Sequence, residues 1–199
     1  CAQLMNSLPP VLVELRAATA ALHRRLDTRL PFSRMDLALY RELMSAYYGF
    51  YQPLERALAP WGEIIPDLEW GRRSKTPYLQ ADLRALGLEN SQIDALPLCS
   101  ELPAITNVAQ ALGALYVLEG ATLGGQVLRN LIEIKIGVGS INGGAFMNVY
   151  GAQTSALWQR FLDCLYPLQS PAERLEAVEV AESTFLCFEQ WLDHCGVLR

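Results

Sequence analysis

One histidine near the start of the chain has neighbours that would suit a bound ligand. His23 lies in a segment of helical periodicity, where residues three, four and seven positions apart share a face. Arg16, Thr19 and Asp27 therefore lie on its stripe, and Ala20 leaves the approach open. Because a neutral imidazole is a common metal ligand, the stripe favours a flat ligand centred on His23, with an acidic edge at Arg16. A lone helical histidine is more often a surface or core residue, so this pattern alone does not assign the site.

A group of glycines marks a second segment that needs an explanation. Gly120 and Gly124 are four positions apart, so they form a strip without side chains on one helical face. A glycine costs about 1 kcal/mol relative to alanine inside a helix, and with Gly125 the segment is expected to bend or break. Either close packing of another helix or contact between the backbone and a flat ligand would explain the strip.

The elements that position these residues are predicted to be helices throughout. The apolar periodicity predicts an all-α fold, a bundle of about six to eight helices. Ser33 is the expected N-cap of the second helix, and Pro53 is expected to kink or end it. Residues 137–144 lack the strand–turn–helix context of a dinucleotide loop, so a mobile loop is expected. The predicted helices span 10–29, 33–58, 77–86, a short piece after 90, 104–136, 153–166 and 171–195.

Composition and charge exclude several classes of protein. The chain has 199 residues, 51% of them hydrophobic, and a net charge of -5, which predicts one domain over 1–199. The chain has no basic run of the kind that indicates nucleic-acid binding. It also has no apolar stretch of about 18–20 residues, the length that a membrane span needs. Five cysteines without a CxxC pair, and no signal-peptide pattern, predict reduced cysteines in a cytoplasmic protein.

Three segments together resemble the heme oxygenase family. The first matches its proximal helix at Leu15, Ala18, Thr19, His23 and Asp27, and the second matches its distal helix at Gly120 and at 123–128. The third, from Ser170 to Phe185, resembles the family's C-terminal helix. The resemblance extends from about residue 12 to 190, and the sequence at 116–120 is most similar to bacterial members, including those that supply biliverdin to phytochromes.

The resemblance implies a role for six residues. His23 would be the proximal ligand of the iron of heme b, and Gly120 and Gly124 would line the distal, catalytic face. Arg16 matches a position that contacts a heme propionate. Arg160 lies near a second such position, and Tyr116 lies near a tyrosine on the propionate side.

The resemblance also implies a reaction and a fold, a single-domain heme oxygenase-like bundle. Heme would be both substrate and cofactor, cleaved with O2 to biliverdin, Fe2+ and CO, and a ferredoxin or reductase would supply electrons, because the chain has no flavin or nucleotide fingerprint. A bacteriophytochrome is one possible acceptor of the biliverdin. Many family members carry an aspartate where this chain has Ala121. Two alternatives therefore stay open: a heme carrier or sensor without turnover, and a non-heme, thiaminase-like protein of the same architecture.

Overall fold

The computed structural model describes residues 8–199, and this part of the chain consists of helices, turns and loops without a strand. The expected all-α fold is confirmed. Residues 8–199 contain seven α-helices, within the predicted range, together with four short 3-10 turns: α1 (Pro10–Arg29), α2 (Leu37–Gly62), α3 (Thr76–Ala85), α4 (Asn90–Asp94), α5 (Val108–Ile136), α6 (Thr154–Asp163) and α7 (Pro171–His194).

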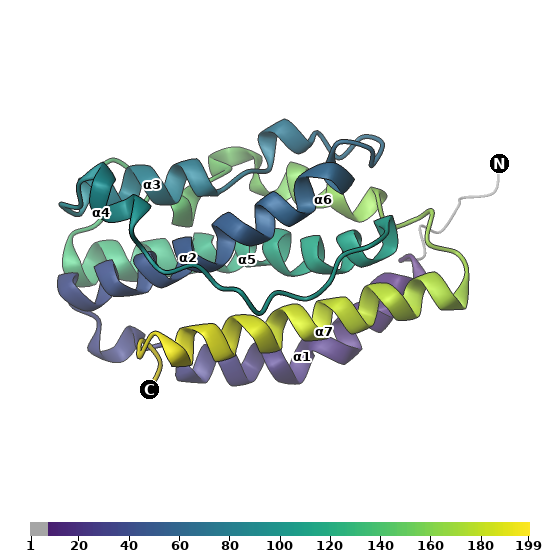
Figure 1. The fold of residues 1–199 in the computed structure, drawn as a ribbon, viewed down its shortest axis with the longest axis horizontal. Coiled ribbons are helices and arrows are strands. Elements are labelled where there is room, and N and C mark those ends of the chain that lie inside the picture. The colour runs from purple at the N-terminus through teal and green to yellow at the C-terminus, as the bar shows by residue number, and fades with distance from the viewer. Residues whose placement is uncertain (1–7) are drawn as a thin grey trace.

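The helices are arranged around α5, which runs through the middle of the bundle (Figure 1). The first and last helices, α1 and α7, lie side by side along one face. Both α2 and α6 contact α5, and the small helices α3 and α4 lie on the far side of the bundle from α1. Two residues far apart in the sequence, His23 on α1 and Gly120 on α5, thereby come to line one cavity.

Side-chain caps fix the residue at which three of the long helices begin. Ser170 and Glu173 form a reciprocal capping box at the start of α7, with Pro171 as the first helical residue. Asn107 caps α5 by accepting a hydrogen bond from the Gln110 amide, so this helix begins later than expected. The prediction of Ser33 as a cap is wrong. Residues 32–34 form a separate 3-10 turn, and Asp36 caps α2 by accepting from the Leu39 amide.

The second helix continues through Pro53 and ends only at Gly62. A proline has no N–H, so the carbonyl oxygen four positions earlier, that of Gly49, loses its helical partner. The amide of Cys99 donates to this oxygen at 2.8 Å. The extended segment between α4 and α5 therefore crosses α2 at Gly49, where any Cβ would lie 2.5 Å from the Pro97 carbonyl oxygen.

The fifth helix is unbroken despite its four glycines. It is also the one helix in residues 8–199 that is long and apolar enough on average to cross a membrane, a point the sequence prediction missed. However, a core helix gives the same signal, and 56% of the most apolar window of α5 is buried in the bundle.

The loop after α5 is anchored rather than free. The Tyr40 hydroxyl donates to the Gly143 carbonyl, and the Asp82 carboxylate accepts from the amides of Ala145 and Phe146 at 2.8 Å each. These bonds argue against the mobile loop that was expected here. Among the described cysteines none forms a disulfide, and Cys99, Cys164 and Cys187 are buried; Cys1 lies outside the described residues.

Candidate functional site

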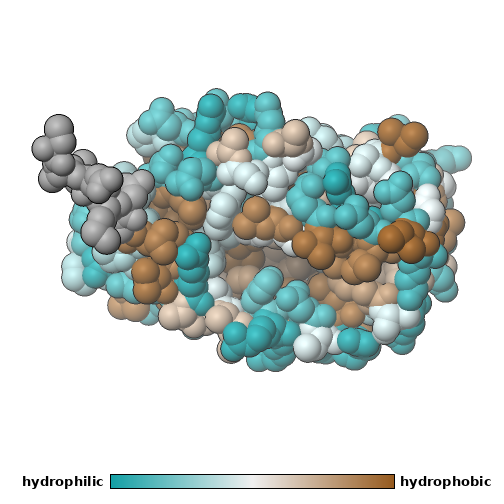
Figure 2. Space-filling view, turned by 180° about the vertical axis from the view of Figure 1, so that it is seen from behind, coloured by the Kyte–Doolittle hydropathy of each residue, from teal (hydrophilic) through white to brown (hydrophobic). Residues whose placement is uncertain are grey.

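A cavity of about 520 Å³ lies between α1 and α5, with further walls from α2, α7 and the loop after α5. Figure 2 shows a hollow on the face opposite to that of Figure 1, with hydrophobic side chains on its walls and hydrophilic ones around it. Five of the six predicted site residues line the cavity: Arg16, His23, Tyr116, Gly120 and Gly124.

His23 is placed on the α1 wall by the periodicity that buries Leu15, Thr19 and Leu26 of the same helix. Its side chain remains 60% exposed, so the imidazole is not a packed core residue. Its Nδ1 atom lies 3.7 Å from Oδ2 of Asp27, and its ring meets the Phe185 ring edge-on at 5.9 Å between centroids. This arrangement leaves Nε2 available as a ligand if Asp27 attracts an N–H at Nδ1.

The glycines of α5 divide into two functional groups. A Cβ on Gly113 would lie 2.1 Å from the Ala177 carbonyl oxygen on α7, and one on Gly125 would lie 2.8 Å from the Met147 carbonyl oxygen. These two glycines allow close packing. A Cβ on Gly124 would meet nothing within 4 Å, and one on Gly120 would only touch the Trp158 ring at 3.9 Å. The bare strip therefore faces open space in the cavity, as the ligand interpretation requires.

Aromatic side chains from α2, α7 and the following loop form the inner wall of the cavity, and sequence reasoning did not assign them to the site. Tyr47 and Tyr51 stack one turn apart on α2, with ring centroids 6.2 Å apart, and Phe146 meets both edge-on. Phe188 of α7 packs against Tyr47 at 5.1 Å. Burial raises the pKa of Tyr47 and Tyr51, so both hydroxyls stay protonated at neutral pH. The sequence does show the spacing of aromatic side chains in α2, but a helix of the hydrophobic core has the same spacing, so the pattern does not identify a cavity wall.

The three remaining predicted residues differ in position. Arg16 is exposed at the edge of the cavity, and Tyr116 is partly buried beside the Trp158 ring, 6.0 Å away between centroids. Arg160 does not line the cavity. It lies on the exposed side of α6 and pairs with Glu69, 2.5 Å away, which also accepts from Arg72. Its predicted propionate contact stays a prediction, for which Glu69 is a competing partner.

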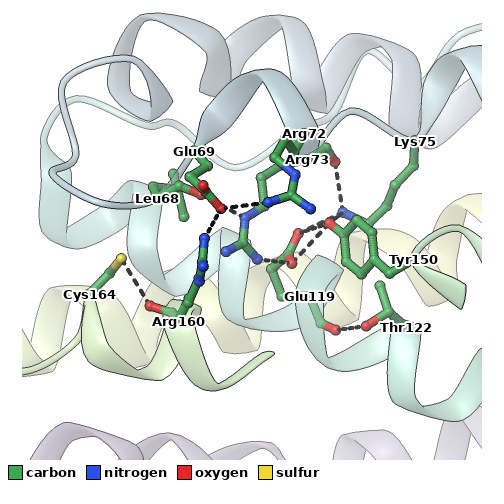
Figure 3. A network of polar contacts seen from close by, with 10 residues as sticks. All are labelled: Leu68, Glu69, Arg72, Arg73, Lys75, Glu119, Thr122, Tyr150, Arg160 and Cys164. Carbon is green, nitrogen blue, oxygen red and sulfur yellow. Dashed lines mark hydrogen bonds and ion pairs between the residues drawn. The ribbon is translucent and has the colours of Figure 1, made fainter. Parts of the chain in front are cut away.

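Behind the start of the glycine strip lies a buried network of charges (Figure 3). Arg73, Lys75 and Tyr150 converge on the Glu119 carboxylate, with 2.6 Å from Lys75 Nζ to Oε1 and 3.0 Å from the Tyr150 hydroxyl to each oxygen. Burial raises the pKa of Tyr150 to about 12, against an opposing effect of the Lys75 charge. The network holds α5 in place directly before Gly120.

Ala121 lines the cavity, and its side chain offers no polar group to a ligand. The neighbouring Thr122 hydroxyl donates to the Glu119 carbonyl oxygen at 2.6 Å. Because the hydroxyl proton is used in this bond within the helix, only the lone pairs of the Thr122 oxygen remain for a ligand or a water molecule.

Known proteins and folds resemble this chain along nearly its whole length. A heme oxygenase of Xanthomonas campestris pv. campestris is 28% identical over 159 residues, which cover 79% of this chain and 91% of that protein. The heme oxygenase of Neisseria meningitidis, solved with NO and CO bound, superimposes with a TM-score of 0.76 at 22% identity, covering 93% of this chain and 91% of that one. Heme oxygenase-1 of the cyanobacterium Synechocystis sp. PCC6803, solved in complex with heme, gives a TM-score of 0.75 at 14% identity, covering 92% and 91%.

The two solved structures establish only the fold of this chain, since their sequence identities with it are low. The family follows from the sequence, because the model of the heme oxygenase family matches residues 10–194. This match spans the helix of His23, the glycine strip and the last helix, the three segments that carried the resemblance. The chain belongs to the heme oxygenase family.

Proposed function

We propose that this protein binds heme b in the cavity between α1 and α5, with His23 as the iron ligand, and cleaves the ring oxidatively to biliverdin, Fe2+ and CO. Membership of the family makes it a heme-degrading oxidoreductase. The observation that carries the proposal is the pairing of a solvent-accessible imidazole with a helix face that has no side chains, in one apolar cavity.

The residues present fit a flat, apolar ring with acidic groups on one edge. Gly120 and Gly124 leave open the space that any larger side chain would fill, and Tyr47 and Phe188 supply apolar walls. Heme, when bound, supplies the redox chemistry through its iron. The protein would orient the ring and exclude bulk water, and Asp27, 3.7 Å from the His23 Nδ1 atom, would orient the imidazole that holds the iron.

We further propose that Arg16, at the edge of the cavity, pairs with a heme propionate and that Tyr116 lies beside it. Arg16 has no ion-pair partner within residues 8–199, so its guanidinium is available for a carboxylate. O2 and electrons from a ferredoxin or reductase are the co-reactants, and a bacteriophytochrome is one candidate acceptor of the product. We also propose a cytoplasmic location, because such a compartment keeps free cysteines reduced.

The test is a titration of the purified protein with hemin, followed by turnover. We expect a sharp Soret band at one hemin per chain. Added ascorbate, or ferredoxin with its reductase, should then replace this band with the absorption of biliverdin, identified by chromatography. A stable complex that releases no biliverdin would indicate the carrier or sensor alternative. Failure to bind hemin would indicate the non-heme alternative.

A further inference from the structure

Two buried cysteines are in contact where the extended segment between α4 and α5 passes next to α7 (Figure 1). The sulfur atoms of Cys99, in this segment, and Cys187, on α7, lie 3.8 Å apart, although the two residues are 88 positions apart in the sequence. Neither side chain lines the cavity, and the proposed function uses neither thiol. The contact therefore needs an explanation of its own.

Hydrogen bonds hold both cysteines in place. The Cys99 amide donates to the Gly49 carbonyl oxygen at 2.8 Å, which fixes this part of the segment against α2. Cys187 is part of α7, and its thiol donates to the Glu101 carbonyl oxygen at 2.9 Å. Because the Cys187 proton is used in that bond, the Cys187 sulfur accepts from the Cys99 thiol. The two thiols are thus hydrogen-bonded neighbours on anchored backbone.

A disulfide between the two residues needs only a small further approach. The sulfur atoms are 3.8 Å apart, and a disulfide bond is about 2.0 Å long, so they must approach each other by about 1.8 Å. Rotation about the two Cα–Cβ bonds moves the sulfur atoms without moving the backbone. The anchored backbone therefore does not prevent the bond.

We infer that Cys99 and Cys187 form a site of reversible oxidation, at which hydrogen peroxide joins the segment to α7 through a disulfide. One thiol sulfur attacks the peroxide, and a sulfenic acid forms as the O–O bond breaks and water leaves. The second sulfur then attacks the sulfenic sulfur, so that the S–S bond forms, the S–O bond breaks and a second water leaves. Two thiols are oxidised, one peroxide is reduced, and both thiol protons end in the water molecules.

The reduced form is the resting state of this site. Burial, together with the neighbouring Cys99 thiol, raises the pKa of the Cys187 thiol. Because the thiolate is the reactive form of a cysteine, a raised pKa makes the reaction slow near neutral pH. The disulfide is therefore expected under sustained exposure to peroxide rather than in the untreated protein.

The disulfide would act on the fold in two ways. Phe185 and Phe188, on either side of Cys187, line the cavity, so the cross-link would fix the turn of α7 that carries this part of the wall. It would also restrict the unfolded chain, because it joins residues 88 positions apart. The oxidised protein should therefore unfold at a higher temperature than the reduced protein.

The test treats the hemin-free protein with hydrogen peroxide and counts free thiols by maleimide labelling in denaturant. The reduced chain has five cysteines and should take five labels, whereas the oxidised chain should take three. Cleavage after glutamate separates Cys187 from Cys195, because Glu189 lies between them. We expect peptides 90–101 and 183–189 to be linked, and dithiothreitol to separate them.

Substitutions distinguish this site from general oxidation of the chain. The thermal midpoint of the wild type should rise by about 5–10 °C on oxidation. Cys99→Ala and Cys187→Ala should each abolish both the linked peptides and this rise. Cys164→Ala, which removes a buried cysteine at the end of α6, is the matched control and should form the link as the wild type does.

Three results would overturn the inference. They are five free thiols after sustained treatment with peroxide, a link from Cys99 to Cys195 instead of Cys187, and a link that forms only in urea. The first would show that the site does not react, and the others that the folded chain does not direct the bond to Cys187. Because no readout involves heme, these results leave the proposed function untouched, and a failure to bind hemin would leave this site untouched.

Discussion

The Nδ1 atom of His23 lies 3.7 Å from the Oδ2 atom of Asp27, one turn further along α1, and both residues line the cavity. This distance is too long for a formed hydrogen bond, but a small rotation of either side chain would close it. After this rotation the carboxylate would orient the imidazole, so the histidine assignment is testable at two positions.

His23→Ala is expected to remove the sharp Soret band of the hemin complex and most of the biliverdin production, because no other histidine lines the cavity in residues 8–199. Added imidazole should restore part of the spectrum by filling the space of the lost ring. Asp27→Asn should keep the band but lower hemin affinity or turnover about tenfold. His194→Ala, at the far end of α7, is the matched control. An unchanged spectrum in His23→Ala would refute the assignment.

Two glycine substitutions on α5 should have opposite effects on stability and binding. Gly124→Leu should leave the free energy of unfolding of the hemin-free protein unchanged or higher, because its side chain enters open space and glycine is a poor helix residue. It should weaken hemin binding at least tenfold by filling the cavity. Gly113→Ala should instead destabilise the protein by about 1–3 kcal/mol through overpacking against α7, with little effect on the cavity. Urea denaturation and hemin titration separate the two effects, and equal effects would contradict the division.

Arg16→Ala is expected to weaken hemin binding several-fold and to change the proportions of biliverdin isomers, because one edge of the ring loses its partner. Arg160→Ala tests the second predicted contact. Since Arg160 pairs with Glu69 outside the cavity, its loss should change hemin affinity by less than about twofold. A loss as large as that of Arg16→Ala would show that Arg160 leaves Glu69 when heme binds.

Glu189 on α7 joins α7 to α1 by accepting from Arg25 and Arg29, and its side chain is only 7% exposed. Desolvation would raise its pKa, but the hydrogen bonds and charges of the two arginines lower it below the usual 4.5. A lowered pKa stabilises the folded state above pH 4.5, and this stabilisation is lost as the pH falls through the folded-state pKa. Glu189→Gln should cost about 2 kcal/mol at pH 7.

The pH dependence supplies the control for Glu189. The difference between Glu189→Gln and the wild type should shrink as the pH falls below 4.5, when the wild-type carboxyl also becomes neutral. Glu179→Gln, on an exposed position of the same helix, should change the thermal midpoint by little at any pH. A Glu189→Gln deficit that is constant between pH 7 and pH 3 would contradict the ion-pair explanation.

The helices, and the two segments that carry His23 and the glycine strip, could be predicted from the sequence because both depend on local patterns. The periodicity around His23 and the Gly120–Gly124 spacing act within a few residues, so the sequence shows them directly. The end of α2 could not be predicted in this way. Pro53 is tolerated because Cys99, far along the chain, satisfies the carbonyl that it leaves free.

The residues of the cavity walls could not be predicted from local patterns either. Tyr47 and Tyr51 look like core residues in the sequence, and only the position of α2 beside α5 and α7 makes them cavity residues. Lys75 gave no signal at all, because a lysine in a short loop is usually solvated. Its burial depends on Glu119, a residue on another helix.

The position of Gly49 links the interhelical segment to the last helix. Its oxygen accepts from Cys99, and its missing side chain leaves room for the Trp191 ring of α7, whose Nε1 donates to the Ala46 carbonyl oxygen. Three separate parts of the chain are therefore held at one turn of α2. Since Phe188, one turn before Trp191, forms part of the cavity wall, a change at this remote junction would alter the shape of the cavity through the tilt of a single helix.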